Sequence, residues 1–293
     1  MVEAAQVPNP VRAARGEFSE LWRRLRRNRT AVAGAGVVAV FVLLALAAPY
    51  LVPYSPIQGN LGDRLQPPSR LHWLGTDELG RDLFSRILYG ARISLQIQLV
   101  SVLLALAIGV VLGSLGGYLG GYVDHVVMRS MDVLLAFPSI FLALGIIAAL
   151  GTGLFNLMLA AGISSIPAFA RIIRASILSL KEREFVEAAL ALGSGNGRIM
   201  FRHLLPNCLA PIIVQSTLRM ATVLLTASGL SFLGLGVQPP TPEWGAMLSN
   251  ARGYLIVAPH VATIPGLAIM IVVVGFNLFG DGLRDTLDPR LRQ

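Results

Sequence analysis

Cysteine, lysine and charge are all scarce in this sequence. Its 293 residues include one cysteine and one lysine, and only 14% of them are charged. Cys208 cannot form a disulfide within the chain, and a lone cysteine outside any motif is most often a small packing residue. A phosphate-cradling P-loop needs a glycine-rich turn that ends in Gly-Lys-Ser or Gly-Lys-Thr, but Lys181 stands in Leu-Lys-Glu. The chain therefore has no P-loop, and any energy from ATP must come from another subunit.

The low charge content indicates a bilayer as the solvent. A soluble domain of this size carries about 25% charged residues, whereas this chain is 54% hydrophobic with a mean hydropathy of +0.67. Its net charge of +8 does not indicate nucleic acid, because no basic helix with interleaved aromatic residues appears. The arginines instead cluster at the ends of apolar runs, where they fix orientation. We expect contact with membrane lipid and no nucleic-acid partner.

Residues that carry chemistry are missing from the apolar runs. No Asp, Glu or Lys lies within their centres, and proton-driven carriers usually need such groups as relays. An intramembrane enzyme needs a nucleophile with a base, or paired metal ligands. His72, His125, His203 and His260 show no metal-ligand spacing. The sequence thus favours a non-catalytic subunit, with no cofactor or metal of its own, over a self-sufficient carrier or an enzyme.

Six apolar stretches are long enough, or nearly so, to cross a ~30 Å hydrocarbon core, which takes about 20 helical residues. They are 31–52, 94–115, 133–150, 154–170, 210–232 and 259–279. Buried helices of a large soluble protein are the alternative, which six such runs in one chain disfavour. The implied organisation is a cytoplasmic basic segment (1–30), a first span (31–52), an extracytoplasmic loop (53–93), a five-helix core (94–279) containing a cytoplasmic loop at 171–207, and a cytoplasmic tail (280–293).

The orientation of these spans follows from where the arginines gather. Five arginines within 23–29 directly precede the first run and place the N-terminus in the cytoplasm by the positive-inside rule. Six crossings return the C-terminus to the same side, where Arg284, Arg290 and Arg292 lie. The outer loop holds four arginines of its own within 53–91, but the bias of the other loops is stronger.

The cytoplasmic loop between the fourth and fifth spans has a pattern of its own. Residues 171–180 continue the fourth span as helix, and 182–192 consist mostly of strong helix formers. Within that second stretch an apolar stripe recurs at i, i+3, i+4 and i+7, with Glu187 beside it. The stripe consists of Phe185, Ala188, Ala189 and Leu192. Three glycines, Gly193, Gly195 and Gly197, then end the helix and permit a sharp reversal. Residues 198–205 follow as a second short helix, and Pro206 marks the entry to the fifth span.

This loop resembles the signature loop of bacterial ABC importer permeases. The residues that carry the resemblance are Glu187, Ala188 and Ala189, then Gly193, then His203 and Pro206 at the family's spacing. Many members have Ile where His203 stands, and His is familiar in the peptide-permease branch. In the family this loop forms a coupling helix that inserts into a groove of the ATPase subunit. The resemblance implies that these six residues shape that contact.

A second block, residues 73–95, predicts an amphipathic helix on the outer membrane surface. An apolar face at helical spacing has charged residues opposite, and Thr76 or Asp77 can cap the start. The apolar residues are Leu79, Leu83, Ile87, Phe84 and Leu88. The charged residues are Arg81, Asp82 and Arg86.

This block, together with 229–240, Glu243-Trp244-Gly245 and 280–290, resembles the C-type permease subunits of dipeptide, oligopeptide and nickel ABC importers. That resemblance implies an all-α integral membrane fold of six transmembrane helices, like type I ABC importer permeases, in the bacterial inner membrane. It also implies a B-type permease partner, two ATPase subunits that bind ATP and Mg²⁺, an extracytoplasmic solute-binding protein, and a peptide substrate. Nickel and glutathione remain alternative cargoes.

Two further patterns concern the interior of the spans. Gln215, Arg219, Thr222 and Thr226 follow steps of four, three and four, so they share one face of the fifth span. Because polar groups facing lipid are costly, this face should line a translocation path or a subunit interface. Small residues every fourth position, at Gly109, Gly113, Gly117 and Gly121, let helices pack closely, although a flexible loop from 116 onward is the alternative for the later part. Pro138, Pro167 and Pro265 should kink or delimit spans.

Overall fold

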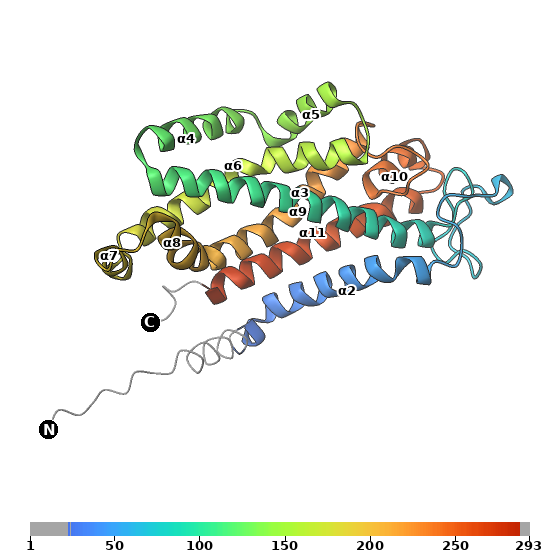
Figure 1. Ribbon diagram of the computed structural model, residues 1–293. Helices are drawn as coiled ribbons and strands as arrows, with labels where there is room; N and C mark the ends of the chain where they lie inside the picture. Colours follow the sequence, from blue (N-terminus) through green and yellow to red (C-terminus); the bar gives the residue numbers. More distant parts are fainter. Residues whose placement is uncertain (1–22, 24, 288–293) are drawn as a thin grey trace.

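The computed structural model describes residue 23 and residues 25–287. This part of the chain consists mainly of long helices lying side by side (Figure 1). The helices are α2 (Arg29–Leu51), α3 (Leu83–Leu119), α4 (Gly121–Leu135), α5 (Ser139–Leu150), α6 (Leu154–Lys181), α7 (Glu184–Ala191), α8 (Asn196–Arg198), α9 (Leu209–Phe232), α10 (Trp244–Ala251) and α11 (His260–Leu287). Within these residues there is no β-strand, and one isolated bridge joins Thr76 and Asp82. The predicted basic segment lies mostly outside the described residues, and so do Arg290 and Arg292 in the tail.

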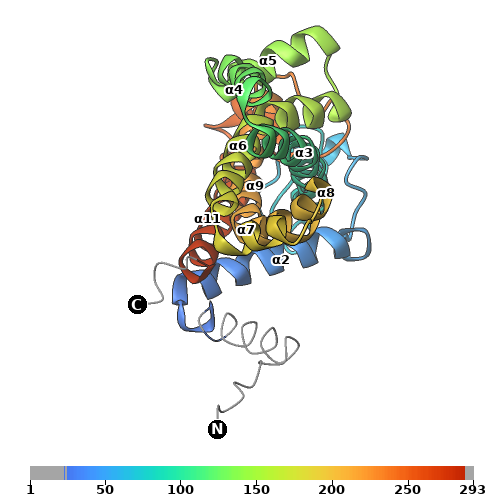
Figure 2. The ribbon, with the colours of Figure 1, turned by 60° about the vertical axis from the view of Figure 1, so that its left-hand side comes forward.

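Membrane-spanning length is reached by five of the described helices, or by six segments if the bent pair α4–α5 is one span. This confirms the predicted all-helical membrane fold. Figure 1 shows α7, α8 and the start of α2 at one end of the bundle, with α10 and the 53–82 loop at the other. We call these the α7 end and the α10 end. Seen along the bundle, α2 and the α4–α5 pair lie on opposite sides of α3, α6, α9 and α11 (Figure 2).

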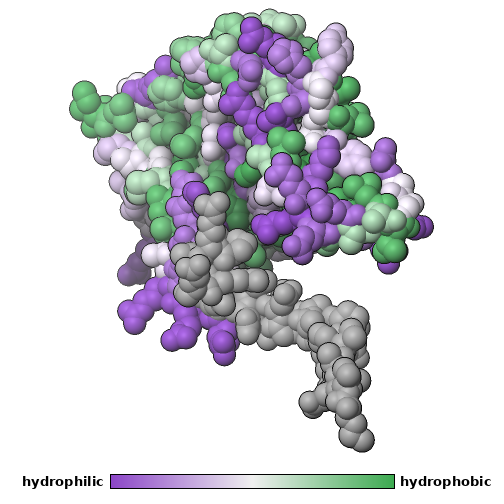
Figure 3. Space-filling view, turned by 90° about the vertical axis from the view of Figure 1, so that its left-hand side faces the viewer, coloured by the Kyte–Doolittle hydropathy of each residue, from purple (hydrophilic) through white to green (hydrophobic). Residues whose placement is uncertain are grey.

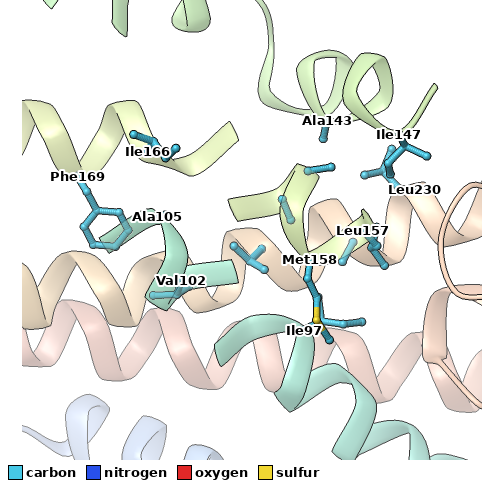
Figure 4. Close-up of a cluster of buried hydrophobic side chains, with 14 of the residues drawn as sticks. Ile97, Val102, Ala105, Ala143, Ile147, Leu157, Met158, Ile166, Phe169 and Leu230 are labelled. Carbon is cyan, nitrogen blue, oxygen red and sulfur yellow. The ribbon is translucent and has the colours of Figure 1, made fainter. Parts of the chain in front are cut away.

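The main core lies where α3, α5, α6 and α9 meet. Figure 4 shows the fully buried Phe169 of α6 pointing toward the part of α3 that carries Ala105 and Val102. A Cβ on Gly109 would overlap Phe169, and one on Gly113 would lie 2.5 Å from the carbonyl oxygen of Ala170. Only glycine therefore lets α3 and α6 approach this closely.

The same spacing continues to Gly117, which is helical and packs against Ile177 of α6. Gly121 has a φ of +52° and forms the turn between α3 and α4. Close packing thus holds for three of the four glycines, and the flexible-loop alternative is wrong for Gly116 and Gly117 because α3 runs to Leu119.

The third span is not the single run predicted over 133–150. The chain turns by 90° between α4 and α5, and Pro138 stands directly before α5. Proline has no amide hydrogen to continue a helix, so the break lies where this residue was expected to act. Pro167 and Pro265 instead lie inside α6 and α11.

The apolar pattern missed the first half of this span because that half carries charged residues. Helix α4 begins at Gly121 and carries Asp124 and Asp132. Asp132 pairs with Arg171 of α6 at 2.6 Å, and Asp124 pairs with Arg174 at 2.5 Å. These pairs hold α4 against α6 and satisfy charges that would otherwise meet lipid.

The separate amphipathic helix predicted on the outer surface is also wrong. Helix α3 begins at Leu83 and continues without a break into the second span, and its cap is Asp82, not Thr76 or Asp77. The charged residues expected to face water are buried. Arg81 pairs with Asp77 and Glu78, Asp82 pairs with His72, and Arg86 lies beside Asp77 and donates to the carbonyl of Pro56. The second span therefore begins among buried charges, before its apolar centre.

Candidate site for energy coupling

Helix α7 lies across the α7 end of the bundle, between the end of α6 and the chain that returns to α9 (Figures 1 and 2). One face of it is fixed to the bundle, because Val186 and Ala189 are buried. Val186 belongs to a small apolar cluster with residues from α6 and from the returning chain. The fully buried members of that cluster are Ile173, Ile177, Val186, Ile199, Leu204 and Cys208. Cys208 is therefore a packing residue, as expected.

The neighbouring face of α7 is apolar and has no cover within the described chain. Phe185 is 42% exposed and Leu192 is 88% exposed, and Ala188 between them is exposed too. The three recur at i, i+3 and i+7, so they form one ridge. The predicted stripe is thus divided, since Ala189 turns inward and its three companions turn outward. Glu187 is exposed beside the ridge. An exposed apolar patch rimmed by polar groups is typical of a surface that contacts another protein or a membrane.

Gly193 sets the point where α7 ends. Its φ is +79°, in the left-handed region that side chains disfavour. Its amide donates to the carbonyl of Leu190 at 2.9 Å, and the amide of Ser194 donates to that of Ala189 at 3.0 Å. These are the two bonds of a Schellman cap. Nothing lies within 4 Å of a Cβ at this position, so only the backbone requires glycine.

The returning chain is a wide helix rather than the regular one predicted over 198–205. Residues Ile199–Leu204 form a π-helix, and Leu205–Cys208 form a 3-10 turn with Pro206 near its start. His203 is half-buried, and its carbonyl accepts a bond from Asn207 Nδ2 at 2.6 Å. The wide turn places Ile199, Leu204 and Cys208 on one side at steps of five and four. Sequence reasoning missed these anchors, because a search for steps of three and four skips them.

The polar face predicted on the fifth span lies on the single helix α9. Gln215, Arg219 and Thr226 are half-buried, and Thr222 is exposed and donates to the carbonyl of Leu218 at 3.3 Å. Arg219 has no ion pair with any described residue. This guanidinium contrasts with Arg171 and Arg174 of α6, which are both paired.

At the α10 end, a buried charge cluster holds the 53–82 loop to the start of α3. Asp77 accepts from Arg81 Nε at 2.6 Å and lies 3.2 Å from Arg86 Nε. Arg81 also bonds Glu78 at 2.9 Å. Asp82 binds His72 at 2.9 Å while it caps α3.

Helix α10 is fixed by the Glu-Trp-Gly motif. Glu243 is fully buried and accepts from the amides of Gly245 and Ala246 at 3.0 and 2.9 Å. Burial raises the pKa of this carboxyl group, and its hydrogen bonds oppose the rise. Trp244 Nε1 donates to the carbonyl of Ile87 at 3.1 Å, which ties α10 to α3.

The described chain is thus a helical membrane bundle that carries an exposed apolar ridge at its α7 end. Residues 109–293 match the family described as binding-protein-dependent transport system inner membrane component, and residues 17–68 match the N-terminal TM domain of oligopeptide transport permease C. The chain belongs to this family of ABC importer permeases, in its C-type branch.

Curated relatives match nearly the whole chain. The dipeptide transport system permease protein DppC of Alkalihalophilus pseudofirmus is 48% identical over 94% of this chain and 90% of its own length. The glutathione transport system permease protein GsiD of Salmonella typhimurium is 50% identical over 95% of this chain and 92% of its own.

Among solved structures, the fold is similar to that of a chain from inward-facing conformations of the MetNI methionine ABC transporter. The TM-score is 0.57 at 19% identity, over 70% of this chain and 97% of the other. The likeness supports the bundle architecture, and the family places the protein in the inner membrane as a multi-pass subunit.

Proposed function

We propose that this chain is the non-catalytic, membrane-embedded C-type half of an ATP-driven importer for di- or oligopeptides. Its partners are a B-type permease, two ABC ATPase subunits that bind ATP and Mg²⁺, and an extracytoplasmic solute-binding protein that delivers the solute. One observation carries the proposal, namely the uncovered ridge of Phe185, Ala188 and Leu192 on a helix that is anchored to two spans.

The anchoring of α7 makes it suitable for transmitting force. Val186 packs in one cluster with Ile177 of α6 and with Ile199 and Leu204 of the chain that enters α9. A push on the ridge therefore reaches both helices, because close-packed apolar contacts transmit strain. ATP-driven closure of the ATPase subunits would shift α7 and, through α6 and α9, open the path to the outside. The remaining coupling residues have supporting roles, with Glu187 at the rim of the ridge, Gly193 at the cap, and His203 and Pro206 in the return.

This assignment puts the α7 end of the bundle in the cytoplasm. The beginning of α2 and the end of α11 lie at the same end as α7 (Figure 1), so both termini are cytoplasmic. Figure 3 looks onto this end and shows hydrophilic residues gathered across it, with hydrophobic ones along its edges. Arg29 at the start of α2 and Arg284 in the last turn of α11 support this topology by the positive-inside rule.

The face of α9 with Gln215, Arg219, Thr222 and Thr226 is the proposed lining of the translocation path. An unpaired guanidinium in a span faces water or another subunit in preference to lipid. Peptide is the favoured cargo, since the relatives' names include dipeptide transport. Glutathione, named for other relatives, and nickel are the alternatives for the same machine. A self-sufficient secondary transporter has less support, and uptake by the purified chain alone in liposomes would favour it.

Ala188→Trp in the assembled transporter tests the coupling role. The new indole lies on an exposed ridge, so folding and membrane insertion should be unchanged. Its bulk should prevent the ATPase from binding against α7. We expect loss of ATPase co-purification and of ATP-dependent uptake in proteoliposomes. Ala188→Ser is the matched control and should transport normally. Full ATPase association with normal uptake in Ala188→Trp would refute the coupling role.

A further inference from the structure

A groove of about 530 Å³ opens between the α7-end halves of α6, α9 and α11. Its walls are mostly apolar, with Ala175 on α6 and Ala210 and Val214 on α9. A few polar side chains stand among them, from Ser176, Ser179 and Asn207. Sites for small solutes have this form, since apolar walls take the solute's body and few polar groups fix its orientation.

The walls of this groove lie on either side of the segment 182–206, which carries α7. The lining on α6 ends at Leu180, the last residue but one of that helix. The lining resumes at Asn207, two residues before α9 begins. The α7 cluster includes Ile177 of α6 and Leu204 of the π-helix that leads into α9. Any displacement of α7 relative to the bundle therefore changes the distance between the two walls.

Arg284 of α11 supplies the groove with a positive charge. Its guanidinium is exposed and makes no ion pair with any residue from 25 to 287. Asp281 and Asp285 lie on the same helix, but neither comes within ion-pair distance of it. The opposite walls contribute hydroxyl and amide groups but no acid. An unpaired guanidinium over an open groove favours a carboxylate ligand.

The groove also continues into the polar face of α9. Pro211 lines the groove, and Gln215 and Arg219 follow it at steps of four residues. Residues four apart on a helix lie on one side. A solute leaving Arg219 would thus meet the groove next, and Arg284 would be the second cation that it passes.

We propose that this groove is a cytoplasmic exit site for the transported solute, with Arg284 holding the solute's carboxylate and with a width that follows α7. The proposal rests on the proposed function and adds to it a site and a ligand class, which is a small solute with a free carboxylate. A bare metal cation does not fit a site whose charge is positive.

Thiol labelling in the assembled transporter tests the site. Cys208→Ala removes the chain's own thiol, and Ser179→Cys places a reporter on the groove wall, with Ala175→Cys as a second reporter should the first fail to assemble. The probe is dialanine, added to transporter in nanodiscs during labelling with a maleimide. We expect dialanine to slow labelling, and dialanine amide, which lacks the carboxylate, to protect much less. Arg284→Gln should weaken protection by dialanine roughly tenfold, as loss of a charge-assisted contact predicts, and Arg284→Lys should restore most of it.

Three results would overturn the exit site: no protection by dialanine at either reporter, equal protection by the amide, or unchanged protection in Arg284→Gln. Labelling that responds to anionic phospholipid in the nanodisc, but not to dialanine, would identify a lipid phosphate as the ligand instead and also overturn it. Trapping with ATP and vanadate should change the labelling rate. That change would show that the width of the groove depends on the position of α7. If coupling through α7 is wrong, the nucleotide effect is lost while protection by dialanine remains, so the two failures are distinguishable.

Discussion

Ser194 donates its amide hydrogen to the carbonyl oxygen of Ala189 at 3.0 Å, across the end of α7. Ala189 is the residue that turns inward from the ridge, so this bond joins the buried face of the helix to the chain that reverses behind it. The bond forms only because Gly193, between them, has a φ of +79°. The angle at which α7 is presented therefore depends on one glycine.

Replacing Gly193 should impair transport without impairing insertion. A Cβ at this position meets nothing within 4 Å, so the cost of Gly193→Ala is conformational, about 1–2 kcal/mol for the left-handed region. We expect weaker ATPase co-purification and slower uptake, with normal amounts of the subunit in the membrane. Gly193→Asn should be milder because Asn tolerates this region.

Gly197→Ala is the matched control, since Gly197 lies in the same loop with open space around it and no positive φ. Uptake should stay normal in this variant. Equal losses at the two glycines would contradict the capping argument.

The sequence was sufficient for the elements that a single local pattern determines. Apolar length located α2, α6, α9 and α11, and helix formers followed by Gly193 located α7. It was insufficient where charges are satisfied by distant partners. Asp124 and Arg174 are 50 residues apart, so no local window shows that α4 is held by ion pairs.

The same reason explains the outer loop. Arg81 and Arg86 were expected to face water because charged residues opposite an apolar face usually do, but Asp77 accepts from one and lies beside the other in the interior. In the candidate site, Gly193 and the exposed Ala188 could be read from the sequence. The buried face of α7 depends on Val186 packing in one cluster with Ile177 and Leu204, which only the fold brings together.

Removing Asp77 should destabilise the outer loop strongly. The carboxylate accepts from Arg81 and from the amides of Leu79 and Arg81, and Asp77→Ala leaves two buried guanidiniums without it. Breaking a buried pair in this way costs about 3–5 kcal/mol. We expect a lower thermal midpoint of the detergent-solubilised subunit and faster proteolysis within 53–82. Glu78→Gln, at the more exposed edge of the cluster, should cost much less, and comparable losses would argue against Asp77 as its centre.

Substitution of Gly113 should separate α3 from α6. Its Cβ would lie 2.5 Å from the carbonyl oxygen of Ala170 and 2.9 Å from Cβ of Ile173, and backbone atoms cannot yield cheaply. Gly113→Leu should therefore cost about 1–3 kcal/mol or more through overpacking. Gly145→Ala on α5 is the control, because it is helical with open space and should be neutral or stabilising by up to about 1 kcal/mol. Thermal unfolding of both variants in one detergent measures the difference.

Glu243 should make the stability of the subunit depend on pH. Burial raises the pKa of its carboxyl group above the ordinary value of 4.5, so the folded state keeps a proton that the unfolded state loses. The contribution of this group is full below pH 4.5 and falls as pH rises through the folded pKa. Glu243→Gln cannot ionise, and it keeps one carbonyl oxygen as an acceptor in place of the two oxygens that accept from Gly245 and Ala246. In thermal unfolding measured across pH, the wild type should therefore lose stability relative to the variant as pH rises from 4.5. The prediction fails if the two curves of stability against pH are parallel, or if the wild type gains stability relative to the variant. Either result would show that burial does not favour the neutral form of the Glu243 carboxyl group.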